Sequence, residues 1–238
     1  MSNPYFRFKQ FTVFHDKCAM KVGTDGVLIG AWTNVQDAAH ILDVGTGTGL
    51  IALMAAQRNP NAKVVAIDVD DHAVEQAIVN IKNSPFPDRI TVASFAFQEF
   101  AQQNANRFDL IVTNPPYFSD SLMPSDEKRA RARHSISLTL DELLHCARMC
   151  LGMNGILSII LPYGKSSELE SLCKKHMYFV KRKTIVYPLP DNEPKRILTE
   201  LALAPVVRTV IDSLTIEVSR HQYTDEFISL AKDFYLTL

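Results

Sequence analysis

Five short apolar segments alternate with helical patterns between residues 41 and 161. The apolar segments are residues 41–45, 63–68, 89–93, 108–113 and 155–161. Helical patterns follow the first two segments, over residues 50–57 and 71–83, and a third precedes the last segment, over residues 140–151. Strands that alternate with helices build an open, mostly parallel sheet with helices on both faces. The sequence therefore predicts an α/β fold.

The chain after residue 178 has a different pattern. Two strand-like segments, residues 179–187 and 196–204, flank a turn region with three prolines, which predicts an antiparallel pair at one edge of the sheet. A short strand at 214–218 and a closing helix at 225–235 complete this part. We expect one domain over residues 1–238, with a core at 37–238, because the first 36 residues are too short to fold alone.

Composition excludes several classes of protein. The chain is 47% hydrophobic and 21% charged, which is ordinary for a globular protein. The longest apolar run, near residues 155–162, is far shorter than the roughly 20 residues of a membrane span. The first ten residues carry no apolar signal core. We therefore expect a cytoplasmic protein without membrane attachment.

The four cysteines do not predict a metal site. They form no CxxC pair, although Cys146 and Cys150 are four residues apart and can share a helix face. Buried thiols in a reducing compartment are the more ordinary interpretation of such a pair. We expect no bound metal.

Charge is unevenly distributed along the chain, although the net charge is only −1. Residues 37–127 hold 5 basic and 12 acidic side chains, a balance of 5 − 12 = −7. Residues 128–220 hold 15 basic and 9 acidic side chains, a balance of 15 − 9 = +6. This asymmetry indicates that the second half meets an anionic partner. Chance clustering on a solvated surface is the alternative.

A glycine-rich loop follows the first predicted strand. The segment from Asp43 to Gly49 reads Asp-Val-Gly-Thr-Gly-Thr-Gly and opens a helix, at the sheet edge where open α/β sheets bind ligands. Its glycines, Gly45, Gly47 and Gly49, have neither the spacing of dinucleotide-binding loops nor the Lys-Ser/Thr of a phosphate-binding loop.

Asp68 ends the next strand, 19 residues after Gly49. A carboxylate there can accept hydrogen bonds from both ribose hydroxyls of a nucleoside. S-adenosylmethionine fits this pattern better than NAD, because it has no pyrophosphate for a helix N-terminus to hold. A plain tight turn is the alternative interpretation.

The segment Asn114-Pro115-Pro116-Tyr117 follows the fourth apolar segment. Its prolines remove two N–H donors and leave carbonyl oxygens free to accept. The side-chain oxygen of Asn114 and the carbonyl of Pro115 can then both accept from one planar amino group, which localises the nitrogen lone pair for attack on a methyl group. Tyr117 offers a face for stacking, and Phe118 is a second candidate. A rigid turn with a surface aromatic is the alternative.

Together these motifs resemble the class I S-adenosylmethionine-dependent methyltransferases that act on planar amino or amide nitrogens. The resemblance implies a Rossmann-like, seven-stranded, mostly parallel sheet with an antiparallel edge hairpin. Residues 11–32, 195–200 and 223–238 are similar to one subgroup, the bacterial tRNA1(Val) (adenine-37-N6)-methyltransferases. By this resemblance residues 1–36 cover the cofactor, and Lys21, Thr24 and Asp25 enclose its methionine end.

The sequence departs from the family at one position. Ala96 stands where such enzymes carry an acid that contacts the cofactor's adenine. Phe97 is then expected to pack on the adenine ring, with Gln98 or a backbone group at its amine.

Basic residues supply candidate contacts to an RNA substrate. The nearest to the active-site motif, together with those expected beyond the edge hairpin, are Lys128, Arg129, Arg131, Arg133, Lys195 and Arg196. A further cluster comprises Lys174, Lys175, Lys181, Arg182 and Lys183. Phosphate contacts of this kind strengthen binding in a salt-dependent way, and a solubilising surface is the alternative. We expect tRNA as the partner and no obligate protein partner.

Four functions stay open on the sequence. Methylation of adenine N6 in tRNA is the leading hypothesis. Methylation of glutamine N5 in a protein release factor uses the same motif, but those enzymes usually carry a helical N-terminal substrate domain, and the roughly 35 residues ahead of the first core strand count against that interpretation. Methylation of guanine N2 in ribosomal RNA or of adenine in DNA is a third possibility. A non-catalytic RNA-binding module on the same fold is the fourth.

Overall fold

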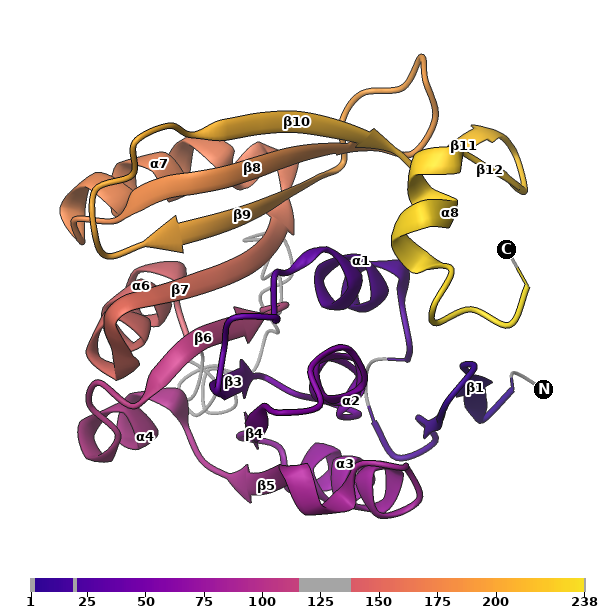
Figure 1. Cartoon of the computed structure of the whole chain (residues 1–238), viewed down its shortest axis with the longest axis horizontal. Coiled ribbons are helices and arrows are strands. Elements are labelled where there is room, and N and C mark those ends of the chain that lie inside the picture. Colours follow the sequence, from indigo (N-terminus) through magenta and orange to yellow (C-terminus); the bar gives the residue numbers. More distant parts are fainter. Residues whose placement is uncertain (1–2, 19–20, 116–137, 238) are drawn as a thin grey trace, which may run out of the picture.

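A sheet of eight strands forms the centre of the described structure (Figure 1). The computed structural model describes residues 3–18, 21–115 and 138–237. The strand order is β10-β8-β9-β7-β6-β3-β4-β5. The bounds are β3 (His40–Val44), β4 (Lys63–Asp68), β5 (Ile90–Ser94), β6 (Phe108–Thr113), β7 (Leu151–Pro162), β8 (Phe179–Tyr187), β9 (Arg196–Ala202) and β10 (Val210–Thr215). Only β9 is antiparallel to its neighbours, and the predicted mostly parallel sheet is confirmed.

Helices cover both faces of this sheet (Figure 1). One apolar core lies between the sheet and α1 (Thr24–Trp32), α2 (Leu50–Arg58), α3 (Asp71–Lys82) and α8 (Asp225–Ala231). The other core lies under α4 (Phe97–Gln103), α6 (Leu140–Cys150) and α7 (Ser166–Lys175). Two short 3₁₀ turns, η1 (Pro87–Arg89) and η2 (Tyr163–Lys165), connect elements. This arrangement confirms the predicted α/β architecture.

The C-terminal strands differ from the prediction in one respect. The expected antiparallel pair forms as β8 and β9, but β10 adds to β8 in parallel and becomes the edge, so the sheet has eight strands rather than seven. The strand expected at 214–218 is divided between β10 and a small hairpin of β11 (Glu217–Ser219) and β12 (Gln222–Tyr223). The first four residues of β10 are exposed, so the strand lacks the apolar alternation that would have revealed it.

The N-terminal segment packs against the other end of the chain. Its two strands, β1 (Tyr5–Arg7) and β2 (Thr12–Phe14), form an antiparallel pair. The backbone N–H of Lys9 donates to the carbonyl of Phe234 at 2.8 Å, and the ring centroids of Phe8 and Tyr235 lie 6.0 Å apart. Figure 1 shows both termini on the same side of the molecule.

Within residues 3–18, 21–115 and 138–237, every helix is too short or too polar to cross a bilayer.

Candidate active site

The glycine loop between β3 and α2 has a backbone that other residues rarely adopt. Gly45, Gly47 and Gly49 have φ values of +72°, +54° and +82°, in the left-handed region that glycine tolerates without cost. A Cβ added to Gly45 or Gly47 would meet nothing within 4 Å, whereas one on Gly49 would lie 3.3 Å from the Cβ of Ala77 in α3. The loop therefore packs on α3 at one end and leaves open backbone at the other, where a ligand can approach closely.

Asp43 braces this loop from inside the protein. The carboxyl group is fully buried, and its Oδ2 accepts from Thr46 Oγ1 at 2.6 Å and from the Ala52 N–H at 3.1 Å. Its Oδ1 has no hydrogen-bond partner among the described residues. Burial raises the pKa of Asp43 to about 7, although the two hydrogen bonds oppose that shift. Asp43 thus acts on the loop and on the first turn of α2.

The raised pKa of Asp43 predicts a pH-dependent stability. An unfolded Asp has a pKa of about 3.9, so between roughly pH 4 and pH 7 the native protein holds a proton that the unfolded chain has released. The free energy of unfolding should therefore fall as pH rises through this window. Asp43→Asn lacks this contribution and should gain stability relative to the wild type between pH 5 and pH 8, by a few kcal/mol at most. Urea unfolding at both pH values measures it, and a pH-independent difference would contradict the account.

Asp68 stands beside the open part of the loop at the end of β4. Its Oδ2 accepts from the Gly47 N–H at 2.8 Å and its Oδ1 from the Asp70 N–H at 3.0 Å. These bonds fix the plane of a partly exposed carboxylate, and each oxygen keeps a lone pair for a further donor. The geometry suits two neighbouring hydroxyl groups, as on a ribose.

Two exposed apolar residues, which no sequence motif singles out, neighbour Asp68. Val69 is 50% exposed and Phe95 is 39% exposed. The Phe95 N–H donates to the Asp68 carbonyl at 2.9 Å and Val69 follows Asp68 in the chain, so both residues lie next to Asp68 at the end of β4. Phe97, the predicted adenine contact, is buried in the apolar core that contains Val44. Nothing distinguishes a single Val or Phe at a strand end from a core residue in the sequence alone.

The sheet register places Asn114 next to the glycine loop. Val44 pairs with Thr113 in the parallel β3–β6 ladder, and Thr113 Oγ1 donates to the Val44 carbonyl at 2.9 Å. Gly45 and Asn114 therefore leave adjacent strands at the same edge of the sheet. Asn114 is half-buried and Pro115 is buried. The other candidates near this motif, Tyr117, Phe118, Lys128, Arg129, Arg131 and Arg133, lie outside the described residues.

The start of α1 joins two groups that the sequence assigned to different ligands. Asp25, predicted at the cofactor, accepts from Nε of Arg196, predicted at the RNA, at 2.8 Å. Nη1 of Arg196 also donates to the Lys195 carbonyl at 2.9 Å. Lys21, Thr24 and Lys195 are exposed. The charge of Arg196 is thus compensated by α1, which leaves Lys195 as the described candidate for an uncompensated contact at the start of β9.

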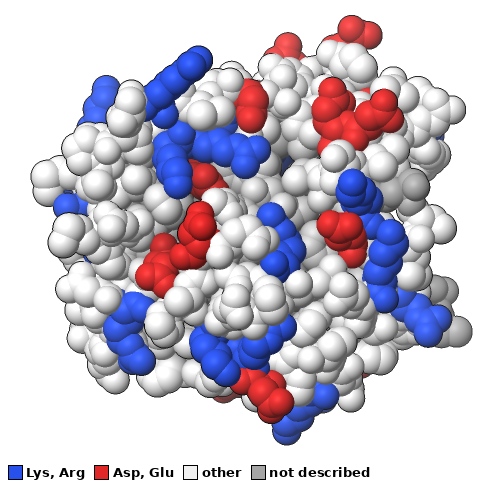
Figure 2. Space-filling view, in the orientation of Figure 1, with Lys and Arg blue, Asp and Glu red and all other residues white. Residues whose placement is uncertain are grey.

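The second basic cluster is largely paired within the protein. Lys175 lies 2.7 Å from Asp141 and Lys183 lies 2.9 Å from Glu170. The guanidinium of Arg182 stacks over the ring of Trp32 at 4.3 Å, and one of its nitrogens lies 3.7 Å from Asp212. Figure 2 shows basic and acidic side chains interspersed over the face it presents. Three of the five basic side chains of this cluster, Lys175, Arg182 and Lys183, therefore already have an acidic or aromatic partner within the protein.

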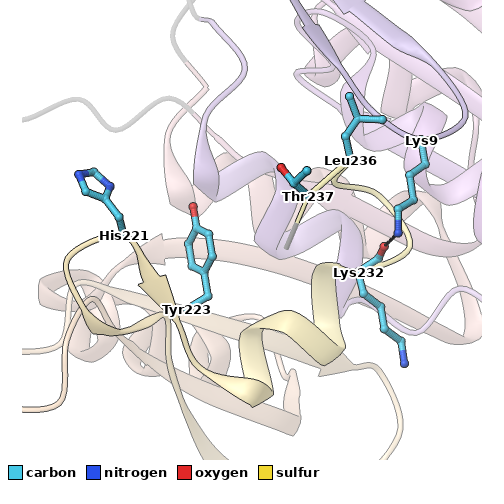
Figure 3. Close-up of a pocket in the computed structure, with 6 residues that line it drawn as sticks. All are labelled: Lys9, His221, Tyr223, Lys232, Leu236 and Thr237. Carbon is cyan, nitrogen blue, oxygen red and sulfur yellow. Dashed lines mark hydrogen bonds between the residues drawn. The ribbon is translucent and has the colours of Figure 1, made fainter.

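A separate open hollow of about 510 Å³ lies beside the C-terminal segment (Figure 3). Its lining comprises Lys9, His221, Tyr223, Lys232, Leu236 and Thr237. The Lys9 ammonium donates to the Lys232 carbonyl at 2.6 Å, and the Lys232 side chain points away from that bond (Figure 3). None of the predicted site residues that the structure describes lines this hollow.

Comparison with solved structures supports the fold. A predicted O-methyltransferase from Agrobacterium tumefaciens has a TM-score of 0.70 at 20% identity, covering 88% of this chain and 96% of that one. The Pyrococcus horikoshii TYW2 structure in complex with MeSAdo has a TM-score of 0.59 at 14% identity, covering 84% and 72%. These similarities confirm the class I methyltransferase fold.

Comparison with sequences identifies the family. The chain matches the methyltransferase small domain over residues 20–178. Proteins named "tRNA1(Val) (adenine(37)-N6)-methyltransferase" are 49% identical in Parabacteroides distasonis, over all of both chains, and 43% identical in Trichodesmium erythraeum, over 99% of both. A protein of the same name in Christiangramia forsetii is 42% identical over all of both chains. The chain belongs to the methyltransferase small domain family, within the group whose curated members carry this name.

Proposed function

We propose that this protein transfers a methyl group from S-adenosylmethionine to N6 of adenine 37 in the anticodon loop of tRNA(Val). The observation that carries the chemistry is the placement of Asn114 beside the open glycine loop, through the β3–β6 register. The substrate rests on full-length identities of 41–49% with relatives of that name. A cytoplasmic location and action as one domain over residues 1–238, without an obligate protein partner, belong to the same proposal.

The described residues fit S-adenosylmethionine. Gly45 and Gly47 offer open backbone at the sheet edge, and Asp68 offers two oriented oxygens for the ribose hydroxyls. Val69 and Phe95 supply apolar surface for the adenine ring, in place of the acid that Ala96 lacks. Lys21, Thr24 and Asp25 are proposed to enclose the methionine end. The bound cofactor supplies an electrophilic methyl group on a sulfonium.

Asn114 and Pro115 prepare the adenine amine for attack. In the proposal the Asn114 side-chain oxygen and the Pro115 carbonyl each accept one N–H of the exocyclic amino group, which pulls the nitrogen toward tetrahedral geometry. Its lone pair then forms the N–CH₃ bond as the S–CH₃ bond breaks. The methylated nitrogen becomes acidic and releases its proton to water, so the site needs no strong base.

Tyr117 is proposed to hold the flipped base, with Phe118 as a second contact. Turning a base out of an RNA loop costs a few kcal/mol, which stacking on an aromatic ring partly offsets. Tyr117→Ala should weaken binding of an anticodon stem-loop by about 1–3 kcal/mol, whereas Tyr117→Phe should bind within about twofold of the wild type, because its ring can still stack. Fluorescence anisotropy measures both, and equal affinity for the alanine variant and the wild type would contradict this role.

Basic residues are proposed to contact the RNA backbone. Those near the active-site motif are Lys128, Arg129, Arg131 and Arg133, and Lys195 adds an exposed charge at the start of β9. Arg196 belongs to this set by sequence, and its bond to Asp25 ties the RNA-facing edge to the cofactor-covering segment.

One labelling experiment tests the class of substrate. The protein is incubated with methyl-tritiated S-adenosylmethionine and a lysate from cells that lack the modification, and RNA, DNA and protein are separated. Label in small RNA, released on digestion as N6-methyladenosine, is expected. Label in protein would replace the substrate by a glutamine amide while keeping the chemistry of Asn114.

A further inference from the structure

A fully buried amide in α3 joins the N-terminal segment to the glycine loop. Asn80 is 0% exposed. Its Nδ2 donates to the Phe14 carbonyl at 2.9 Å and to the Thr48 carbonyl at 2.8 Å. Its Oδ1 accepts from the Phe14 N–H at 2.9 Å. Both amide hydrogens and one oxygen lone pair are therefore used, and all three bonds go to backbone groups outside α3.

A second buried amide extends this attachment. Gln76 lies one helical turn before Asn80 on the same face of α3 and is 2% exposed. Its Oε1 accepts from the Lys17 N–H at 3.1 Å. The two amides hold residues 12–18, here called the strap, along α3. The Lys17–Glu75 ion pair at 3.9 Å is exposed on both sides and adds little.

The strap ends beside the proposed cofactor site. Cys18 is partly buried, and burial together with the charges of Asp68 and Asp70 raises its pKa to about 11. The strap thus approaches the carboxylate that the proposal gives to the ribose. Gly49 contacts Ala77 on the same helix, so α3 supports the glycine loop and the strap together.

We propose that Asn80 is a positioning residue for the cofactor site, which holds the strap and the glycine loop in one fixed relative position. The inference rests on the proposed function for the identity of the cofactor. When the amide is removed, Phe14 can return its N–H and carbonyl to water only if the strap leaves α3. Cofactor binding must then order the strap again, and the affinity falls by that cost. The methyl-transfer step, which depends on Asn114, is not affected once the site is full.

Three leucine variants separate positioning from general stability. Asn80→Leu removes all three bonds, and Gln76→Leu removes only the bond to Lys17. Asn59→Leu is the matched control. Asn59 is also a buried asparagine, 4% exposed, and its Nδ2 donates to the carbonyls of Val35 and Ala38 at the opposite edge of the sheet, before β3 and β4.

The readouts are the Kd for S-adenosylmethionine by calorimetry, KM and kcat with the RNA substrate, and Tm. Asn80→Leu should raise the Kd and KM for S-adenosylmethionine about 10- to 100-fold, with kcat at saturating cofactor within about threefold of the wild type. Gln76→Leu should show the same pattern with a smaller shift. Asn59→Leu should lower Tm and leave the Kd unchanged.

Two results would overturn the inference. One is a Kd that is unchanged in Asn80→Leu or shifted equally in Asn59→Leu. The other is a loss confined to kcat. The calorimetric arm contains no methyl acceptor, so it succeeds or fails independently of which substrate is methylated, whereas a wild-type protein that binds cofactor but methylates no tRNA contradicts the proposed function alone.

Discussion

Replacing Asn114 with alanine is expected to lower kcat about 10²- to 10³-fold. The variant loses the side-chain oxygen that is proposed to accept from the adenine amine and keeps the backbone carbonyl of Pro115. Because a preorganised acceptor stabilises the tetrahedral nitrogen more than the planar one, the loss should fall on the chemical step. Single-turnover methylation at saturating S-adenosylmethionine measures it.

The control for this variant is Asn61→Ala. Asn61 is exposed and precedes β4 at the opposite edge of the sheet, so its loss should leave turnover at the wild-type level. Calorimetry on Asn114→Ala should also show that the cofactor still binds. A variant at Asn114 that retains near-full turnover would remove this residue from the chemistry.

Replacing Asp68 with alanine should weaken S-adenosylmethionine binding at least about 10²-fold. Two hydrogen bonds from ribose hydroxyls to a carboxylate contribute about 1.5–3 kcal/mol each, and about 1.4 kcal/mol corresponds to a factor of ten. The variant also releases the Gly47 N–H that Asp68 holds at 2.8 Å, which loosens the loop. Calorimetric titration of the purified variant gives the Kd directly.

Asp70→Ala is the matched control, since Asp70 caps α3 by accepting from the His72 N–H at 3.0 Å. Loss of the cap should cost about 1 kcal/mol of stability and leave the cofactor Kd near the wild-type value. Equal affinity in Asp68→Ala and Asp70→Ala would contradict the ribose role of Asp68.

The parts of the site that the sequence predicts are those coded by adjacent residues. The unit of β3, glycine loop and α2 is contiguous, and its strand, glycines and helix each carry a local pattern. Asp68 and Asn114 also follow apolar strands directly, and parallel strands bring their carboxyl ends to one edge. Topology therefore places them together without further information.

The missed features depend on contacts between distant residues. Asp25 and Arg196 are 171 positions apart, and each has a separate and reasonable role when considered alone. Asn80 resembles any polar residue in an amphipathic helix until the strap is placed beside it. The strand β10 pairs with β8 through exposed residues, so its place in the sheet is set by backbone pairing rather than by an apolar face.

Mass spectrometry of a defined tRNA tests the central claim most directly. A tRNA(Val) transcript and a variant with guanine at position 37 are each incubated with the protein and S-adenosylmethionine, digested with nuclease and sequenced by fragment mass. The account predicts one added methyl group at adenine 37, recovered as N6-methyladenosine, and an unmodified variant transcript. Methylation of both transcripts at another nucleotide, or of neither while the cofactor is bound, would contradict it.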